Sequence, residues 1–175
     1  MSFAYRAGYV GPFAIAKSVG RKGEIQKFRY VSPTTKDRIG QFLIVLRGEV
    51  GLRWSTLGDD VFPLKAGGSF TMDGPQVPLE VDTELTVMAL EDAEFLCISA
   101  YGLRQKVAVE RHRLMTGDAI QGSRHELMIV TGDDAQIQIS NGPVVTGPRL
   151  IYARHAEPVL KAHSPVVVAA CTLAG

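Results

Sequence analysis

Apolar residues along this chain occur in short runs of strand length, and glycine, proline or aspartate separates one run from the next. Short apolar runs with frequent turn residues are typical of antiparallel strands in a sandwich or barrel. The pattern therefore predicts an all-β protein. The predicted strands lie near 12–17, 25–31, 41–47, 49–54, 60–65, 69–73, 77–82, 85–90 and 94–100, and then near 126–131, 135–140, 143–146, 149–154, 157–162 and 165–172.

One arrangement of these runs occurs twice. The first copy starts at Gln41 with a polar residue, which an apolar run, Gly48 and a second strand follow. The second copy starts at Glu126 and has Gly132 in the corresponding place. The repeat predicts two related β-barrel or sandwich units, with Gly48 and Gly132 at equivalent turns.

The runs divide the chain into four expected parts. These are an N-terminal arm with edge strands (1–40), a first unit (41–101), a connector (102–125) and a second, shorter unit (126–175). In the connector, Leu103, Val107 and Leu114 fit a helical face, but Val107-Ala108-Val109 suits a strand, and a strand or crossover piece is favoured. We expect the two units to pack together, because about fifty residues make a marginal domain alone.

Two turn motifs stand out in the stretch from Gln41 to Ser99, Leu46-Arg47-Gly48-Glu49 between two predicted strands and Leu64-Lys65-Ala66-Gly67-Gly68 further on. With these motifs the stretch resembles the cupin superfamily, whose sequences often show a Leu-x-Gly-Glu turn between two strands and then an apolar-Ala-Gly-Asp turn. The C-terminal half resembles a shortened, diverged copy. The resemblance implies a jelly roll or β-barrel with a second, shorter cupin-like unit, but it says little about function, because one fold hosts many activities.

The resemblance also implies where a metal would bind. Active cupins hold a divalent ion with imidazoles and a carboxylate, the donors that iron, nickel, manganese and zinc accept. In the first unit, Gln41 stands at the glutamate position, Lys36 lies upstream, and Val77 to Leu79 lie near the last ligand position. We therefore expect no metal there. The interior should instead be filled by Phe42 or Leu43, Val45, Leu52, Phe70, Val77 and Leu79.

The second unit offers an alternative metal site. It would combine Glu126 with His155 and His163, although this spacing is not that of the family. His125 precedes Glu126, and only one of two adjacent strand residues can face a barrel interior. Exposed or hydrogen-bonded histidines are the preferred interpretation, so no metal and no cofactor is expected.

The sequence offers few signs of catalytic or other ion-binding sites. The sequence contains no nucleophile elbow, phosphate loop or dinucleotide fingerprint, so we expect no catalytic residues. Cys97 and Cys171 lie in apolar runs and are interpreted as small buried residues, in preference to a disulfide or a catalytic thiol. The pairs Asp59-Asp60 and Asp133-Asp134 suit solvated turns, with weak calcium binding as the alternative.

Charge and hydropathy narrow the set of partners. The formal net charge is +1, which favours neither nucleic acid nor an acidic membrane surface as a partner. No apolar run has the length of a membrane span. Gly8, Gly11 and Pro12 interrupt the apolar N-terminus, so no secretory signal is predicted and synthesis in the cytoplasm is expected.

The N-terminal arm carries more aromatic side chains than an isolated arm should expose. We expect Phe3, Tyr5, Tyr9 and Phe13 to form an interface, with strands added to the chain's own barrel or to that of a neighbour. The favoured function is a non-enzymatic structural protein that forms homo-oligomers or joins other structural proteins, such as a phage decoration, collar or fibre-attachment subunit of the virion.

The alternative function is a metal-dependent cupin enzyme or a small-ligand binding protein. In the second case Trp54, Tyr5, Tyr9, Tyr30 and Phe28 could line a sugar-binding cleft.

Overall fold

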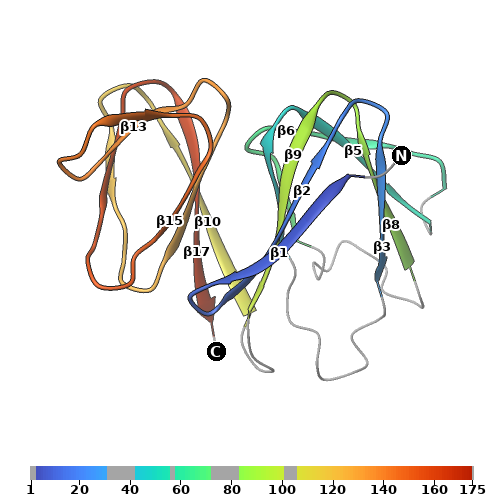
Figure 1. Ribbon diagram of the computed structural model, residues 1–175, viewed down its shortest axis with the longest axis horizontal. Coiled ribbons are helices and arrows are strands. Elements are labelled where there is room, and N and C mark those ends of the chain that lie inside the picture. Colours follow the sequence, from blue (N-terminus) through green and yellow to red (C-terminus); the bar gives the residue numbers. More distant parts are fainter. Residues whose placement is uncertain (1–2, 31–41, 56–57, 72–82, 101–105, 175) are drawn as a thin grey trace. The chain divides into compact units, whose positions relative to one another are not determined.

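The computed structural model describes residues 3–30, 42–55, 58–71, 83–100 and 106–174 (Figure 1). These residues form strands and turns and no helix, so the protein is all-β as predicted. No helix in these ranges could therefore span a membrane. The chain divides into two compact units, unit 1 over residues 1–106 and unit 2 over residues 107–174. The strand predicted near 77–82 lies outside the described residues.

Unit 1 consists of two antiparallel sheets. One has the strand order β1-β2-β9-β4-β7 and the other β3-β8-β5-β6. Its strands are β1 (Ala4–Val10), β2 (Phe13–Gly20), β3 (Ile25–Tyr30), β4 (Phe42–Arg47), β5 (Glu49–Trp54), β6 (Phe62–Lys65), β7 (Ser69–Thr71), β8 (Thr83–Ala89) and β9 (Ala93–Ala100). The first forty residues thus contribute three strands, β1 to β3, to the sheets of unit 1.

Unit 2 also consists of two sheets, with the orders β10-β17-β12-β15 and β11-β16-β13-β14. Its strands are β10 (Lys106–Leu114), β11 (Ala119–Gln121), β12 (Leu127–Thr131), β13 (Gln136–Ile139), β14 (Val144–Thr146), β15 (Arg149–Tyr152), β16 (Val159–Ala162) and β17 (Val166–Ala174). The segment 102–125 was expected to be a connector. Its described residues form β10 and β11 and no helix.

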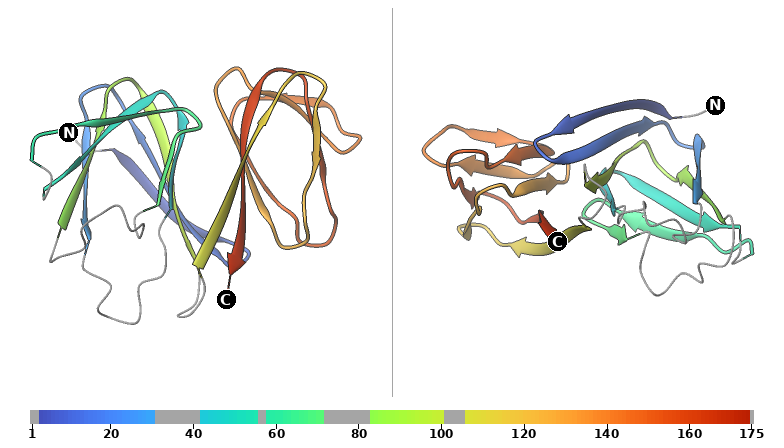
Figure 2. Two further views of the ribbon diagram at one scale, coloured as in Figure 1. Left: turned by 180° about the vertical axis from the view of Figure 1, so that it is seen from behind. Right: turned by 90° about the horizontal axis from the view of Figure 1, so that it is seen from below.

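The two units share one topology. If β1 is set aside, adding eight to each strand number of unit 1 (β2-β9-β4-β7 and β3-β8-β5-β6) reproduces the strand orders of unit 2. In each unit the first of the eight strands pairs with the last, β2 with β9 and β10 with β17. The two sheets of a unit face each other, and this arrangement is a jelly roll (Figure 2). The repeated unit read from the sequence is therefore a repeated eight-stranded fold.

The correspondence extends to single hydrogen bonds. At the corner after β2, the N–H of Gly23 donates to the carbonyl of Ala89 over 2.8 Å, and at the corner after β10 the N–H of Gly117 donates to the carbonyl of Ala162 over the same distance. A carboxylate closes each turn, since Glu24 accepts from the backbone N–H of Arg21, and Asp118 accepts from that of Met115, both at 2.9 Å.

Gly48 and Gly132 lie at corresponding corners, where the chain passes from one sheet of its unit to the other. Their φ angles are +68° and +102°, in the left-handed region that L-residues with a Cβ avoid. Gly48 alone separates β4 from β5, whereas residues 132–135 separate β12 from β13.

The core of unit 1 is built around Phe95. Its ring centroid lies 5.2 Å from that of Phe3 and 6.2 Å from that of Phe28, both in edge-on geometry. Of the side chains predicted to fill the interior, Leu43, Val45 and Leu52 are buried in this core, and Phe70 packs against it. Phe42 is also buried, whereas Val77 and Leu79 lie outside the described residues.

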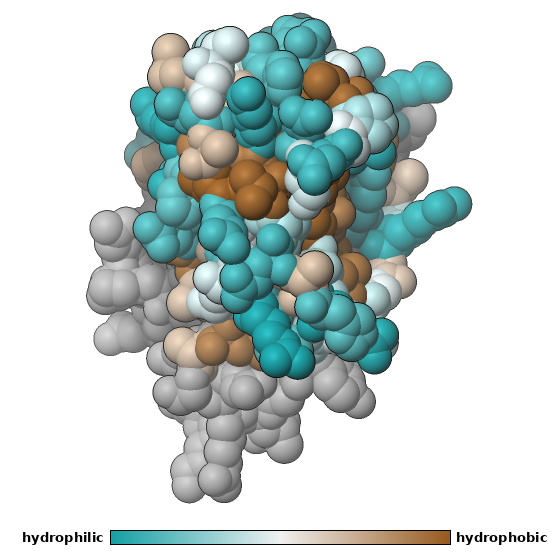
Figure 3. Space-filling model, turned by 90° about the vertical axis from the view of Figure 1, so that its left-hand side faces the viewer, coloured by the Kyte–Doolittle hydropathy of each residue, from teal (hydrophilic) through white to brown (hydrophobic). Residues whose placement is uncertain are grey.

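Unit 2 has its own apolar core. Its buried members include Leu114, Met128, Val130, Ile137, Leu160 and Val168. Leu114 lies on β10, in the segment expected from the sequence to be a connector, so β10 completes this core. The surface of the molecule shown in Figure 3 is largely hydrophilic, with hydrophobic patches between polar side chains. Exposed apolar residues of unit 2 are Met115, Val144, Leu150 and Val159.

Candidate functional site

The N-terminal strand β1 is the first candidate for a functional surface. It lies at the end of the five-stranded sheet of unit 1, where it pairs with β2 from Ala4 opposite Val19 to Val10 opposite Phe13 (Figure 1). Its side chains from Ala4 to Tyr9 are all exposed, with 55% exposure for Tyr5 and 70% for Tyr9. We call this strand, with its two tyrosines, the β1 edge.

The other two residues expected at an interface are buried. The ring of Phe3 packs on Gly20, where a Cβ would come within 2.4 Å of it, and belongs to the core around Phe95. Phe13 is 0% exposed. These two side chains are therefore unavailable to a partner of the folded chain, and the exposed part of the expected interface is Tyr5 and Tyr9.

A pocket of about 330 Å³ lies beside the β1 edge, in unit 1. Tyr5, Tyr9 and Phe28 line it, three of the aromatic residues that the sequence suggested for a ligand cleft. Trp54, the fourth, is 2% exposed and packs on Phe70 with ring centroids 5.2 Å apart, so it belongs to the core. The side chain of Tyr30 lies outside what the structure describes.

Ala14, Ala16 and Ser99 also line this pocket, and sequence reasoning did not identify them. The signal was present in the sequence as small residues at alternate positions of two strands. Small side chains at positions that would otherwise fill a barrel leave space inside it.

The structure does not bring the alternative metal ligands together. Among the residues that it describes, no three His, Cys, Asp or Glu side chains are placed to hold a metal ion. Glu126 is 8% exposed, and its carboxylate accepts a hydrogen bond from the backbone N–H of Ser123, so it stabilises the turn before β12. His155 and His163 are both exposed. The positions implied for a metal in the first unit, from Lys36 to Gln41 and from Val77 to Leu79, lie outside the described residues.

The histidines have ordinary polar neighbours. His125 Nδ1 lies 3.4 Å from the hydroxyl of Tyr152, and His163 Nε2 lies 3.4 Å from the Gln138 side-chain oxygen. His125 also has a φ of +64°, which places it in the turn that Glu126 closes. These contacts agree with the interpretation of exposed, hydrogen-bonded histidines.

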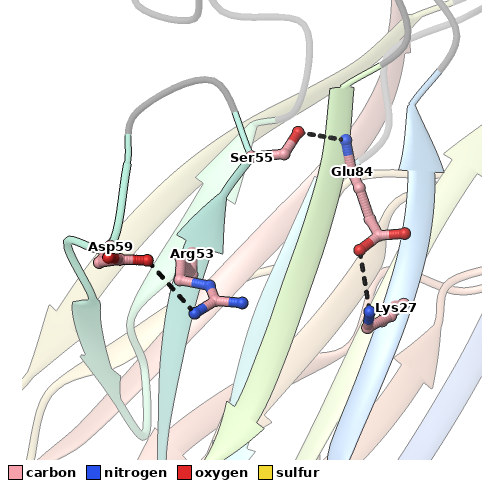
Figure 4. A network of polar contacts seen from close by, with 5 residues as sticks. All are labelled: Lys27, Arg53, Ser55, Asp59 and Glu84. Atoms are coloured by element: carbon pink, nitrogen blue, oxygen red, sulfur yellow. Dashed lines mark hydrogen bonds and ion pairs between the residues drawn. The ribbon is translucent and has the colours of Figure 1, made fainter.

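The acidic turn residue Asp59 belongs to a surface network in unit 1, drawn in Figure 4. It lies 3.8 Å from the guanidinium of Arg53, and Lys27 lies 3.2 Å from Glu84. The backbone N–H of Glu84 donates to the hydroxyl of Ser55 over 2.9 Å. Exposed ion pairs of this kind contribute little free energy, so we assign this network a surface role.

The two cysteines are free thiols, as the sequence favoured, but only Cys171 is buried as expected, whereas Cys97 is half-buried and lines the pocket beside the β1 edge. Burial raises the pKa of Cys97 to about 12, and burial together with the nearby Glu126 raises the pKa of Cys171 to about 12. A raised pKa holds the thiol in its protonated, unreactive form.

We expect both native thiols to react with iodoacetamide at about pH 8 at least a hundredfold more slowly than in the unfolded chain, because the thiolate fraction falls about tenfold per pKa unit. Mass spectrometry of labelling time courses, with and without guanidinium chloride, measures this ratio. Since the unfolded thiols ionise at a lower pH than the folded ones, the same shifts predict a stability that falls as pH rises above about 9. Rapid labelling of either native thiol would contradict this description.

Comparisons with known proteins show the fold. No family model matches the chain, and no curated protein matches it in sequence. Among solved structures, the cupin 2 conserved barrel domain protein from Leptotrichia buccalis is similar with a TM-score of 0.60 and 7% identity, over 99% of this chain and 89% of that one. A conserved protein of unknown function from Pseudomonas aeruginosa PAO1 is similar with a TM-score of 0.57 and 18% identity, over 98% and 87%.

A third similar structure is a bacterial pirin from Escherichia coli in complex with nickel(II). Its TM-score is 0.53 at 11% identity, over 97% of this chain and 82% of the pirin chain. At these identities the likeness concerns fold alone. Together with the repeated jelly roll, it shows that the chain has the fold of the cupin superfamily, in two units.

Proposed function

We propose that this two-unit cupin-fold chain is a non-enzymatic assembly protein that joins a second copy of itself through the β1 edge. The observation that carries the proposal is a seven-residue strand at the end of its sheet, with two exposed tyrosines and no proline. A strand at the edge of a sheet offers backbone N–H and C=O groups to another strand. Adding a strand from a second copy would extend the sheet of unit 1.

The other edge strands of the two units carry features that oppose such pairing. β6 contains Pro63, β7, β11 and β14 have three residues each, and β15 has four, the first of which is Arg149. β3 contains Lys27 and Arg29, and five of the nine residues of β10 are Lys, Glu, Arg or His. Proline, short length and charge are the usual protections of an edge. β1 carries Arg6 as its only charged residue, so it is the long edge with the least protection.

The sequence of β1, Ala-Tyr-Arg-Ala-Gly-Tyr-Val, is symmetric in its tyrosines. If two copies pair antiparallel about a two-fold axis at Ala7, Tyr5 of each copy lies opposite Tyr9 of the other on one face of the sheet. Each such aromatic pair contributes roughly 0.2–1 kcal/mol. Because the strand is short, we expect an interface at the small end of specific contacts and a dissociation constant in the micromolar range or weaker.

Substituting Ala7 by Glu tests this interface. In the proposed pairing two carboxylates would face each other across the axis, and like charges directly opposite destabilise a strand pair. Sedimentation velocity over a concentration series should show a monomer–dimer equilibrium for the natural chain and a monomer for Ala7→Glu. The matched control is Ala119→Glu, which places the same charge on the exposed strand β11 of unit 2 and should leave the equilibrium unchanged. A dimer that survives Ala7→Glu would refute the proposal.

A particle setting is part of the proposal. A phage decoration, collar or fibre-attachment subunit would use such an edge to join copies or neighbouring structural proteins. Co-sedimentation of the chain with purified particles, for the natural sequence and for Ala7→Glu, tests this setting. If binding to particles survives Ala7→Glu, attachment uses another surface.

The alternative function is a metal-dependent cupin enzyme, and the nickel(II) in the similar pirin is the observation that favours it. Plasma mass spectrometry of the purified chain, before and after incubation with iron, nickel and manganese, separates the two functions. The assembly proposal expects substoichiometric metal in every case, and one tightly held ion per chain would favour the enzyme.

A further inference from the structure

The pocket beside β1 has a volume of about 330 Å³, which lies within the range of small-molecule sites. A water molecule occupies roughly 30 Å³ in the liquid. If each non-hydrogen atom of a ligand needs a similar volume, the pocket has room for about ten of them. Every residue described as lining it belongs to unit 1, from β1, β2, β3 and β9. Its shape is therefore set by the sheets of one unit.

The strand register explains the empty space. Tyr9 pairs with Ala14, which pairs with Ser99, and in the next row on the same face Ala7 pairs with Ala16, which pairs with Cys97. One row further, Ser18 lies opposite Phe95, whose ring fills the core. The ring of Phe95 thus fills the barrel interior in its own row. In the rows of Ala14 and Ala16 the side chains are small, so the interior stays open there.

The chemistry of the walls restricts the occupant. Tyr5, Tyr9 and Phe28 present aromatic rings, which favour offset or edge-on contact with another ring. The tyrosine hydroxyls and Ser99 offer hydrogen bonds. None of the described lining residues carries a formal charge, and an ion in such a site would lose hydration without a counter-charge.

We propose that this pocket binds a neutral, planar aromatic molecule of about ten non-hydrogen atoms that carries a hydroxyl or carbonyl group. The ligand lies over the small residues Ala14 and Ala16, between the aromatic side chains at the rim and Phe28. This site is formed by residues of one chain, although Tyr5, Ala7 and Tyr9 also belong to the β1 edge of the proposed assembly.

Three probes of similar size test the proposed ligand class by isothermal titration calorimetry. 2-Naphthol is neutral and planar, decahydro-2-naphthol has the same heavy atoms without aromatic rings, and 2-naphthoate carries a charge. We expect 2-naphthol to bind with an affinity at least about tenfold above that of either other probe, a difference that corresponds to about 1.4 kcal/mol. Equal affinity for the saturated alcohol would show an apolar site without aromatic preference and would overturn the proposal. Tighter binding of the naphthoate would overturn it too.

A substitution that fills the pocket locates the binding. Leucine at Ala16 would project three additional carbon atoms into the space, so Ala16→Leu should weaken 2-naphthol binding at least about tenfold. Ala4→Leu is the matched control, because Ala4 pairs with Val19 on the other face of the same sheet, and it should bind like the natural chain. Ser99→Leu fills the same space from β9 and serves if Ala16→Leu fails to fold. Unchanged binding by folded Ala16→Leu or Ser99→Leu would place the ligand elsewhere and refute the proposal.

Both measurements should be made at concentrations where sedimentation shows a single species. Failure of ligand binding would then leave the assembly proposal intact. Likewise, failure of Ala7→Glu to change the oligomeric state would say nothing against the pocket.

Discussion

Replacing Gly48 by alanine is expected to lower the free energy of unfolding of unit 1 by roughly 3 kcal/mol or more. A Cβ at this position would lie 2.1 Å from the carbonyl oxygen of Asp92. That oxygen belongs to the backbone between β8 and β9, so it cannot rotate away as a side chain would. The φ of +68° adds the strain of the left-handed region.

Gly132→Ala is the matched control at the corresponding corner of unit 2. Its φ is also positive, but the nearest atom to an added Cβ is that of Ala135 at 4.0 Å. Only the backbone strain remains, and the expected loss is about 1 kcal/mol. Urea titrations followed by tryptophan fluorescence report on unit 1, because the chain has one tryptophan, Trp54. Far-ultraviolet circular dichroism follows both units. Equal losses for the two variants would contradict the close approach at Gly48.

Phe95→Ala is expected to destabilise unit 1 by roughly 3–5 kcal/mol. Phe95 is 0% exposed, and the rings of Phe3 and Phe28 pack on it from two other segments of the chain. Removing the ring therefore leaves a cavity and costs two aromatic contacts at once.

Phe62→Ala provides the comparison for this substitution. Phe62 lies on the edge strand β6 and is 47% exposed, so the loss should be below about 1 kcal/mol. The same fluorescence titration measures both variants. A loss below about 1 kcal/mol for Phe95→Ala would mean that the core of unit 1 is not organised around this ring.

Short apolar runs and turn residues were enough to predict most of the strands. β4 and β12 were readily predicted because they are continuous apolar runs, and every residue from Phe42 to Leu46 and from Leu127 to Thr131 is buried. β1 was missed, because a strand whose side chains are almost all exposed has no buried face to impose an alternating pattern. β11 has three residues, which is too short for periodicity to register.

The cysteines show a limit of reading repeats from sequence. Cys97 and Cys171 each lie in an apolar run near the end of a repeated unit, on the corresponding strands β9 and β17, but they lie on different faces of these strands. Cys97 pairs with Leu43, a core residue of unit 1. Cys171 pairs with Leu127, whereas Met128 and Val130 belong to the core of unit 2. A shift of one residue exchanges the two faces of a strand, and composition alone does not reveal it.

The candidate interface shows the same limit for aromatic residues. Apolar composition identified Phe3, Tyr5, Tyr9 and Phe13 together, but it cannot tell side chains that face their own core from those that face solvent. The structure separates them by burial. Because β2 lies between β1 and β9 in its sheet, single substitutions in β1 test the interface without removing a central strand.

The most direct test of the proposed assembly is disulfide cross-linking through the two-fold axis. In the antiparallel pairing, Ala7 is the residue that lies opposite its own copy, with Cα atoms about 4.5–5.5 Å apart, a separation that a disulfide spans. Arg6 lies opposite Gly8 of the second copy, so it does not meet itself. Under mild oxidation, we expect Ala7→Cys to form a covalent dimer on a non-reducing gel and Arg6→Cys to stay largely monomeric. Equal cross-linking of the two variants, or none for Ala7→Cys at concentrations where the chain self-associates, would contradict it.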